Sequence, residues 1–103
     1  MATQRQRMVS EALESLIPHA PLSETTEIKA LANREHMRGL PVSRAIWLST
    51  VTHIRHAHTA YHELLADGYD RDAARHFVLE ETNDVLESWG STARLQFDDQ
   101  TDV

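Results

Sequence analysis

The fold is decided by residues 43–70, SRAIWLSTVTHIRHAHTAYHELLADGYD. This stretch has no proline, and its first glycine is Gly68, so we expect one helix of about 25 residues after a Ser43 cap. Large side chains recur at steps of four and three residues and define one seam along it: Trp47, Val51, Ile54, His58, Tyr61 and Leu65. Partner helices should pack along this seam.

The segment that follows predicts a second helix folded back on the first. Gly68 can take the left-handed conformation that ends a helix, and Asp70 can cap the next one. We expect that next helix to run from Arg71 to about Trp89 and to end at Gly90. Because the turn between the two helices is short, they should form an antiparallel hairpin.

The first forty residues predict two further helices that cover the remaining apolar surface. One should span residues 4–17 and end before Pro18, and the other should begin at a Ser23 cap and stop at Gly39. Residues 91–97 are expected to be extended or docked, and residues 98–103 to form a flexible acidic tail. The prediction is an all-α, four-helix orthogonal or bundle-like domain over residues 1–97.

Composition narrows the class of protein. The chain of 103 residues has no cysteine, which excludes disulfides, thiolate metal sites and cysteine nucleophiles. Three glycines and three prolines are too few for the turns of an all-β sandwich. No apolar run reaches the length of a membrane span, so we expect a cytoplasmic protein without a membrane partner. A homodimer is expected because small cores gain stability from a second copy, although intramolecular packing would fill the same seam.

Charge is unevenly distributed along the chain, whose formal net charge is −6. Residues 28–62 carry five basic side chains and one acidic, whereas residues 63–103 carry three basic and eleven acidic. We expect the two segments to neutralise each other within one chain or across a dimer. The alternative is nucleic-acid binding by the basic residues of the middle, which the acidic total disfavours: Lys29, Arg34, Arg38, Arg44 and Arg55.

Four of the seven histidines fall in the long helix and raise the possibility of a metal site: His53, His56, His58 and His62. Spacings of three and four residues place two imidazoles on one helix face. The two pairs formed in this way do not share a face, however, and spacing fixes no third ligand. We therefore expect no metal and no cofactor, with a metal-dependent enzyme as a further alternative.

Sequence patterns give no catalytic residue. The segment from His62 to Ala66 begins like the metalloprotease motif His-Glu-x-x-His, but alanine stands where the second histidine is required. Phosphate-binding glycine loops and nucleophile elbows are also missing from the sequence. An enzyme is therefore unsupported by any motif.

A polar constellation on the predicted hairpin is the candidate binding site. Arg55, Thr59 and His62 are spaced along one face of the long helix, and the turn should bring Arg71 and Arg75 toward them. Arginine forks suit a carboxylate or a phosphate. The same arginines would brace the hairpin if they pair instead with nearby carboxylates: Glu63, Asp67, Asp70 and Asp72.

Aromatic side chains are expected mainly in the core or an interface, because four of them lie in apolar stripes: Trp47, Tyr61, Phe77 and Trp89. Tyr69 lies at the turn and is included among the candidate ligand-binding residues. There it can anchor a partner or pack back on the hairpin.

The second half of the chain resembles the bacterial family known as domain of unknown function 2293. The resemblance rests on residues 54–89, namely Ile54-Arg55-His56, Thr59, Tyr61, Leu64-Leu65, Gly68-Tyr69-Asp70-Arg71, Ala74-Arg75, Val78, Leu86 and Trp89. His62 departs from the acidic residue usual in the family after this tyrosine. The resemblance implies an independent helical module without an assigned activity. The residues together favour a non-catalytic module that interacts with a protein or binds an acidic ligand.

Overall fold

The computed structural model describes residues 2–96, and the predicted acidic tail at 98–103 lies outside this range. The described residues are helical and contain no strand, which confirms the all-α class. In chain order the elements are α1 (Gln4–Leu16), α2 (Leu22–Ala32), the short 3-10 helix η1 (Glu35–Met37), α3 (Val42–His58), α4 (Tyr61–Ala66), α5 (Arg71–Phe77) and α6 (Leu79–Ser88).

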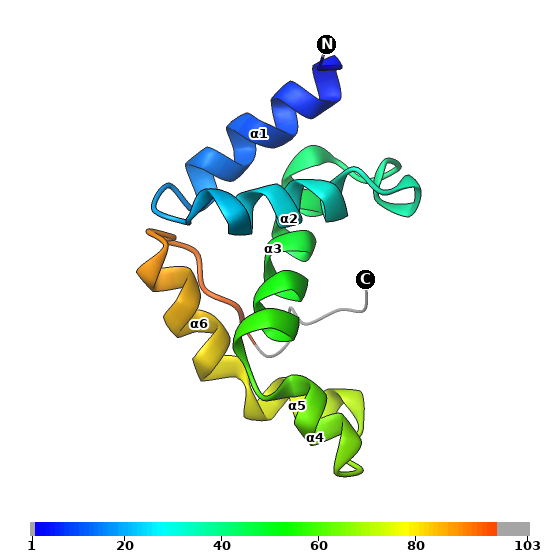
Figure 1. Ribbon diagram of the computed structural model, residues 1–103, viewed down its shortest axis with the longest axis vertical. Coiled ribbons are helices and arrows are strands. Elements are labelled where there is room, and N and C mark those ends of the chain that lie inside the picture. Colours follow the sequence, from blue (N-terminus) through cyan, green and yellow to red (C-terminus); the bar gives the residue numbers. More distant parts are fainter. Residues whose placement is uncertain (1, 97–103) are drawn as a thin grey trace.

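The helices form an elongated arrangement around α3, as Figure 1 shows. At one end α1 and α2 cross α3, and both pack against it. At the other end α4 continues roughly in the direction of α3, and the chain returns through α5 and α6. Contacts join α3 with α6 and α4 with α5, so the antiparallel hairpin predicted from the short turn is present.

The second and third expected helices begin at prolines rather than at the predicted serine caps. Pro21 and Pro41 hold the cap positions of α2 and α3, with φ of −61° and −54°. Proline fixes φ close to these values, and its missing N–H is not needed at a helix start. Ser23 and Ser43 lie inside the first turns, and their prediction as caps is wrong.

The second helix is also shorter than predicted. It ends at Ala32 instead of continuing to Gly39. The Asn33 side chain donates to the carbonyl of Lys29 at 2.9 Å, and the chain then turns through η1. This turn places Met37 in the core with 1% of its surface exposed.

The long third helix of the prediction is divided at residues 59 and 60. The hydroxyl of Thr59 donates to the carbonyl of Arg55 at 2.5 Å and accepts from the amide of Tyr61 at 3.2 Å. A threonine that binds neighbouring backbone groups competes with the helical hydrogen bonds and can bend or end a helix. His58, which the seam prediction buried, is consequently the last residue of α3 and is exposed.

The fourth expected helix is divided as well, at Val78. Val78 has φ of −100° and ψ of 10°, and α6 starts at the next residue. Phe77 therefore leaves the predicted apolar face: it is 57% exposed and meets the ring of Tyr69 edge-on at 5.2 Å between centroids.

The predicted turn and helix ends are confirmed where the local signals are strong. Gly68 and Gly90 have φ of 102° and 87°, in the left-handed region that favours glycine. The carboxylate of Asp70 accepts from the amide of Ala73 at 2.8 Å and caps α5.

Two clusters of buried side chains stabilise the described part of the chain. The larger one joins α1, α2, α3 and α6 with the C-terminal segment, and includes Val9, Leu13, Ile28, Ile54, Leu86 and Leu95. The smaller one holds the hairpin end together and consists of Tyr61, Ala74 and Val78, with Leu64 and Leu65 packed against it.

The segment after Gly90 is docked on α6. Asn83 donates through Nδ2 to the carbonyl of Leu95 at 3.0 Å, and its Oδ1 accepts from the amide of Leu95 at 2.6 Å. Leu95 and Asn83 are each 2% exposed. One side chain thus satisfies both backbone groups of a residue that enters the main core.

Among residues 2–96, no helix combines the length and the apolar character needed to cross a membrane.

Candidate functional site

Three arginines line one pocket where the end of α3 meets the hairpin α4–α5. The pocket has a volume of about 150 Å³ and is lined by Thr52, Arg55, His56, Tyr61, Leu65, Arg71 and Arg75. Arg55 comes from α3, whereas Arg71 and Arg75 lie one turn apart on α5. Three of these lining residues carry a guanidinium group.

Two of the three arginines are held inside the protein. Arg55 is 3% exposed and Arg75 is 6% exposed, while Arg71 at the start of α5 is exposed. The guanidinium carbon of Arg55 lies 5.5 Å from the centre of the Tyr61 ring, a cation–π distance. Tyr61 is itself buried in the smaller cluster, so the ring fixes the position of the Arg55 head group.

His56 forms part of the pocket wall and contacts two neighbouring rings. Its ring meets that of Tyr61 edge-on at 5.4 Å, and its Nδ1 lies 2.6 Å from Nε2 of His62. Burial lowers the pKa of His56 from its ordinary value of 6.5, and the charges of His62, Arg55 and His53 lower it further. The lowered pKa favours the neutral form of the His56 ring.

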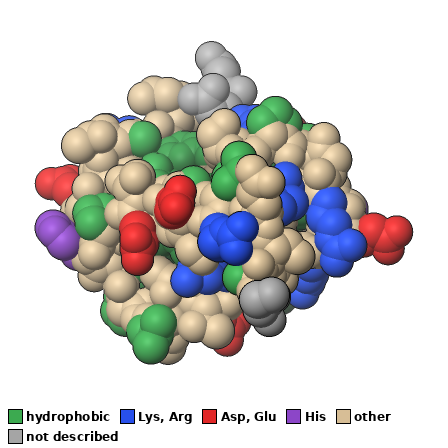
Figure 2. Space-filling model, turned by 90° about the horizontal axis from the view of Figure 1, so that it is seen from above, with side chains coloured by type: hydrophobic (Ala, Val, Ile, Leu, Met, Phe, Trp, Pro, Cys, Tyr) green, Lys and Arg blue, Asp and Glu red, His purple; other side chains and the backbone are tan. Residues whose placement is uncertain are grey.

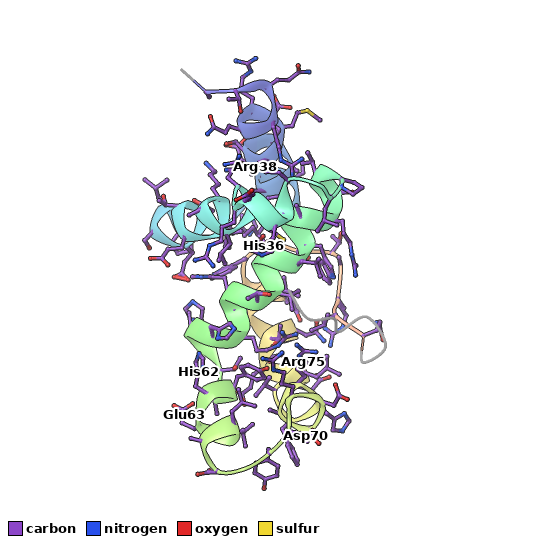
Figure 3. The ribbon with its side chains drawn as sticks, turned by 90° about the vertical axis from the view of Figure 1, so that its right-hand side faces the viewer. His36, Arg38, His62, Glu63, Asp70 and Arg75 are labelled. Atoms are coloured by element: carbon purple, nitrogen blue, oxygen red, sulfur yellow. The ribbon has the colours of Figure 1, made fainter. Side chains whose placement is uncertain are left out.

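The other predicted site residues lie around this pocket rather than in its described lining. Thr59 supports the break between α3 and α4 through its two backbone hydrogen bonds. His62 is exposed on α4 and pairs with His56, and Figure 3 shows it well separated from Arg75. Tyr69, 45% exposed, packs on Phe77 at the hairpin turn.

Sequence reasoning missed four pocket residues: Thr52, His56, Tyr61 and Leu65. Tyr61 and Leu65 belong to the predicted apolar seam, and the guanidinium of Arg55 lies over the Tyr61 ring. Thr52 lines the pocket because it lies one helical turn before Arg55 on α3, and His56 does so as the residue after Arg55. The three-residue spacing from Thr52 to Arg55 is a signal that could have identified Thr52.

A larger hollow adjoins the arginine pocket. It lies between α2 and α3, has a volume of about 650 Å³, and is lined by Thr26, Glu27, Ala30, Leu31, Arg34, Thr52, His53 and His56. Because Thr52 and His56 line both spaces, the two hollows lie side by side along α3.

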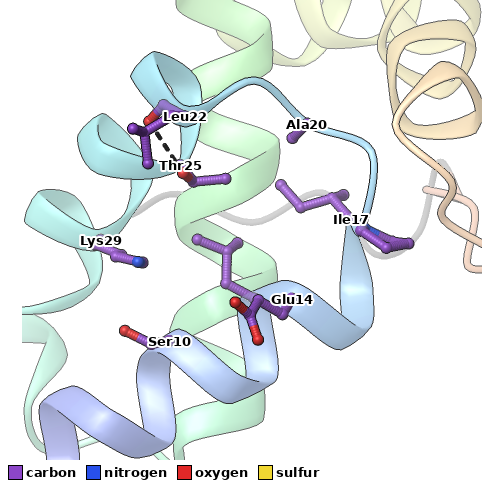
Figure 4. A pocket seen from close by; sticks show the side chains of 9 residues that line it. Ser10, Glu14, Ile17, Ala20, Leu22, Thr25 and Lys29 are labelled. Atoms are coloured by element: carbon purple, nitrogen blue, oxygen red, sulfur yellow. Dashed lines mark hydrogen bonds between the residues drawn. The ribbon is translucent and has the colours of Figure 1, made fainter.

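A third depression lies between α1 and α2 and is shown in Figure 4. Its volume is about 220 Å³, and Glu14 and Lys29 bring charges of opposite sign to its rim. Thr25 uses its hydroxyl to donate to the carbonyl of Leu22 at 3.0 Å. The depression therefore carries no excess of positive charge.

The basic residues considered for nucleic-acid binding do not all lie on one surface. Arg55 is buried in the pocket, and Arg34 lines the hollow between α2 and α3. Arg38 donates from Nε to the carbonyl of Asn33 at 3.1 Å. Figure 2 shows Lys and Arg side chains gathered on one side of the end formed by α1 and α2, with Asp and Glu side chains beside them.

The comparison with family models identifies the chain. Residues 7–90 match the model of the uncharacterized conserved proteins known as domain of unknown function 2293. The chain belongs to this family. The match covers α2 through α6, including all three arginines of the pocket, and so extends the resemblance seen in residues 54–89 toward the N-terminus. No curated protein and no solved structure matches the chain.

Proposed function

We propose that this member of the family is a binding module for an acidic ligand, and that the arginine pocket takes one carboxylate or phosphate group of that ligand. The convergence of Arg55, Arg71 and Arg75 on one small pocket carries the proposal. Planar guanidinium forks bind both kinds of anion with two parallel hydrogen bonds.

The size of the pocket limits what it can hold. Whole small-molecule ligands occupy sites of roughly 300–1,000 Å³. A pocket of about 150 Å³ instead suits a single anionic group, with the rest of the ligand outside it. The adjoining hollow offers apolar contacts from Ala30 and Leu31 to such an extension, and its two charged residues, Glu27 and Arg34, are of opposite sign. A segment of a partner protein with an acidic side chain for the pocket and apolar side chains beside it fits this combination.

Direct binding assays test the proposal. Fluorescently labelled peptides rich in aspartate are titrated with the protein, together with matched peptides in which asparagine replaces aspartate. We expect Arg71→Gln to weaken binding about tenfold, since a hydrogen bond to a charged group contributes about 1.5–3 kcal/mol. Arg71 is exposed, so its replacement should leave the fold intact.

The matched control is Arg94→Gln, which removes an exposed arginine that lies 3.6 and 3.9 Å from the carboxylates of Glu80 and Glu87. Equal losses in the two variants would mean that only net charge matters, and would refute a specific pocket. Duplex DNA is included as a competitor. Tight, steeply salt-dependent DNA binding that is unaffected by Arg71→Gln would instead favour the nucleic-acid alternative.

The expected homodimer is also a proposal for this module. Light scattering after size exclusion, with and without the acidic peptide, measures the mass of the particle in solution. A mass of one chain at micromolar concentration would contradict it.

A further inference from the structure

A second cluster of polar side chains lies at the contact between α2 and α3, apart from the arginine pocket. Oε1 of Glu24, in the first turn of α2, lies 2.8 Å from Nε2 of His53 and 2.5 Å from Nε2 of His58. One carboxylate oxygen from α2 therefore faces two imidazole nitrogens from α3.

The two histidines approach the carboxylate from different directions. They are five residues apart, which separates them by about 140° around an ideal helix. Their ring centroids are 6.0 Å apart and the ring planes meet at 74°. The rings are thus not stacked but converge on the space beside Glu24.

We propose that Glu24, His53 and His58 form a binding site for a divalent transition-metal ion, and that zinc is the ion it fits best. Two imidazoles and one carboxylate are a ligand set that binds zinc, with water in the remaining position. The three ligand atoms lie within 4.8 Å of one another. This inference does not depend on the proposed function of the arginine pocket.

The distances are compatible with a bound ion after a small adjustment. Zinc lies about 2.0–2.2 Å from nitrogen and oxygen ligands, which places two tetrahedral ligands about 3.4 Å apart. The two carboxylate–imidazole distances are shorter than this by less than about 1 Å. An ion therefore requires the Glu24 carboxylate to move away from the two imidazole nitrogens by less than about 1 Å.

The environment also suits a metal site that exchanges with solvent. The side chains of His53 and Glu24 are 9% and 19% exposed, and that of His58 is 35% exposed, so an ion can reach them from one side. The ring of Trp89 meets that of His58 edge-on at 5.5 Å and limits its rotation. The open side leaves room for water as the fourth ligand.

A bound cation would join α2 to the end of α3 and stabilise the folded chain, since an ion held only by the native state favours that state.

Calorimetric titration of zinc chloride into protein without a histidine tag, previously stripped with a chelator, tests the inference. We expect one zinc ion per chain, and a rise of roughly 10 °C in Tm when free zinc exceeds Kd about a hundredfold. Glu24→Gln and His58→Ala should each weaken zinc binding at least tenfold. Thermal unfolding without metal confirms that each variant is folded, and His58 is exposed at a helix end, where replacement is tolerated.

The matched control is His62→Ala, because His62 belongs to the other close histidine pair, with His56. It should leave the stoichiometry and Kd for zinc unchanged. Loss of binding in His62→Ala but not in His58→Ala would place the ion at that other pair and overturn the inference. The inference would also be overturned if the wild-type protein failed to bind one zinc ion per chain, or if saturating zinc left its Tm unchanged. In that case Glu24 is a carboxylate that accepts hydrogen bonds from two histidines.

Discussion

Replacement of Asn83 by alanine should release the C-terminal segment from the domain. Asn83 makes two hydrogen bonds with the backbone of Leu95, and both residues are 2% exposed. The substitution removes both bonds, each worth about 1 kcal/mol net. If Leu95 stays in the core, its N–H and C=O are left unpaired, which costs about 1–3 kcal/mol for each group.

The chain can avoid these unpaired groups only by giving up packing. Release of the segment lets water bind the backbone of Leu95, but it loses the burial of a leucine side chain, worth about 1.5–3 kcal/mol. Because the chain takes the less costly route, the free energy of unfolding should fall by about 1.5–3 kcal/mol. For a domain of this size, that corresponds to a decrease in Tm of at least about 6 °C.

Urea unfolding followed by far-ultraviolet circular dichroism measures this loss. Thr92→Ala, an exposed change in the same segment, serves as the control and should be close to wild type. If the segment is released, Leu95→Ala should add little to Asn83→Ala, because the leucine has already left the core. A loss below about 1 kcal/mol for Asn83→Ala would refute the reasoning that this side chain holds the segment in place.

Three further predictions use the same urea titration. Thr50 and Thr82 are both fully buried, but the Thr82 hydroxyl donates to a backbone carbonyl at 2.8 Å, whereas the Thr50 hydroxyl has no partner among residues 2–96. Thr50→Val should therefore raise the free energy of unfolding by about 1 kcal/mol and Thr82→Val should lower it by about as much; shifts of equal sign would contradict this. Gly90→Ala should lower the free energy of unfolding by at least about 1–2 kcal/mol, because φ of Gly90 is 87° and the new Cβ would lie 2.9 Å from Nδ1 of His19. An unchanged urea midpoint would show that alanine is not strained at this position. Asp70→Ala should cost about 1 kcal/mol through loss of the α5 cap, and Asp70→Asn, which keeps an oxygen acceptor, should recover most of it.

The parts of the fold that were predictable depend on local signals. Gly68 and Asp70 specify the hairpin turn through backbone conformation and capping, which involve only neighbouring residues. The break at Thr59 was not predictable in the same way, because a threonine in a helix can bind solvent or the preceding turn with similar ease. Val78 carries no helix-ending signal at all. At Val78, tertiary packing overrides helix propensity.

The candidate site shows the same division. The grouping of Arg55, Arg71 and Arg75 in one pocket was predictable from the sequence, because a single short turn joins the two helices of the predicted hairpin that carry them. The cluster of Glu24, His53 and His58 was not predictable. Glu24 precedes the two histidines by 29 and 34 residues in the chain, and they meet only because α2 crosses α3. Crossing geometry depends on how two whole faces pack, which periodicity along one helix does not specify.

The presence of two separate hydrophobic clusters would link occupancy of the proposed anion site to the local stability of the hairpin. Arg55 belongs to α3, whose core is the larger cluster, whereas Arg71 and Arg75 belong to α5, which is held by the smaller one. A small cluster opens at a lower free energy than a large one, and its opening would separate the cations. An anion bound across them must therefore suppress this opening, and its presence would slow amide hydrogen exchange in α4 and α5 much more than in α1 and α2.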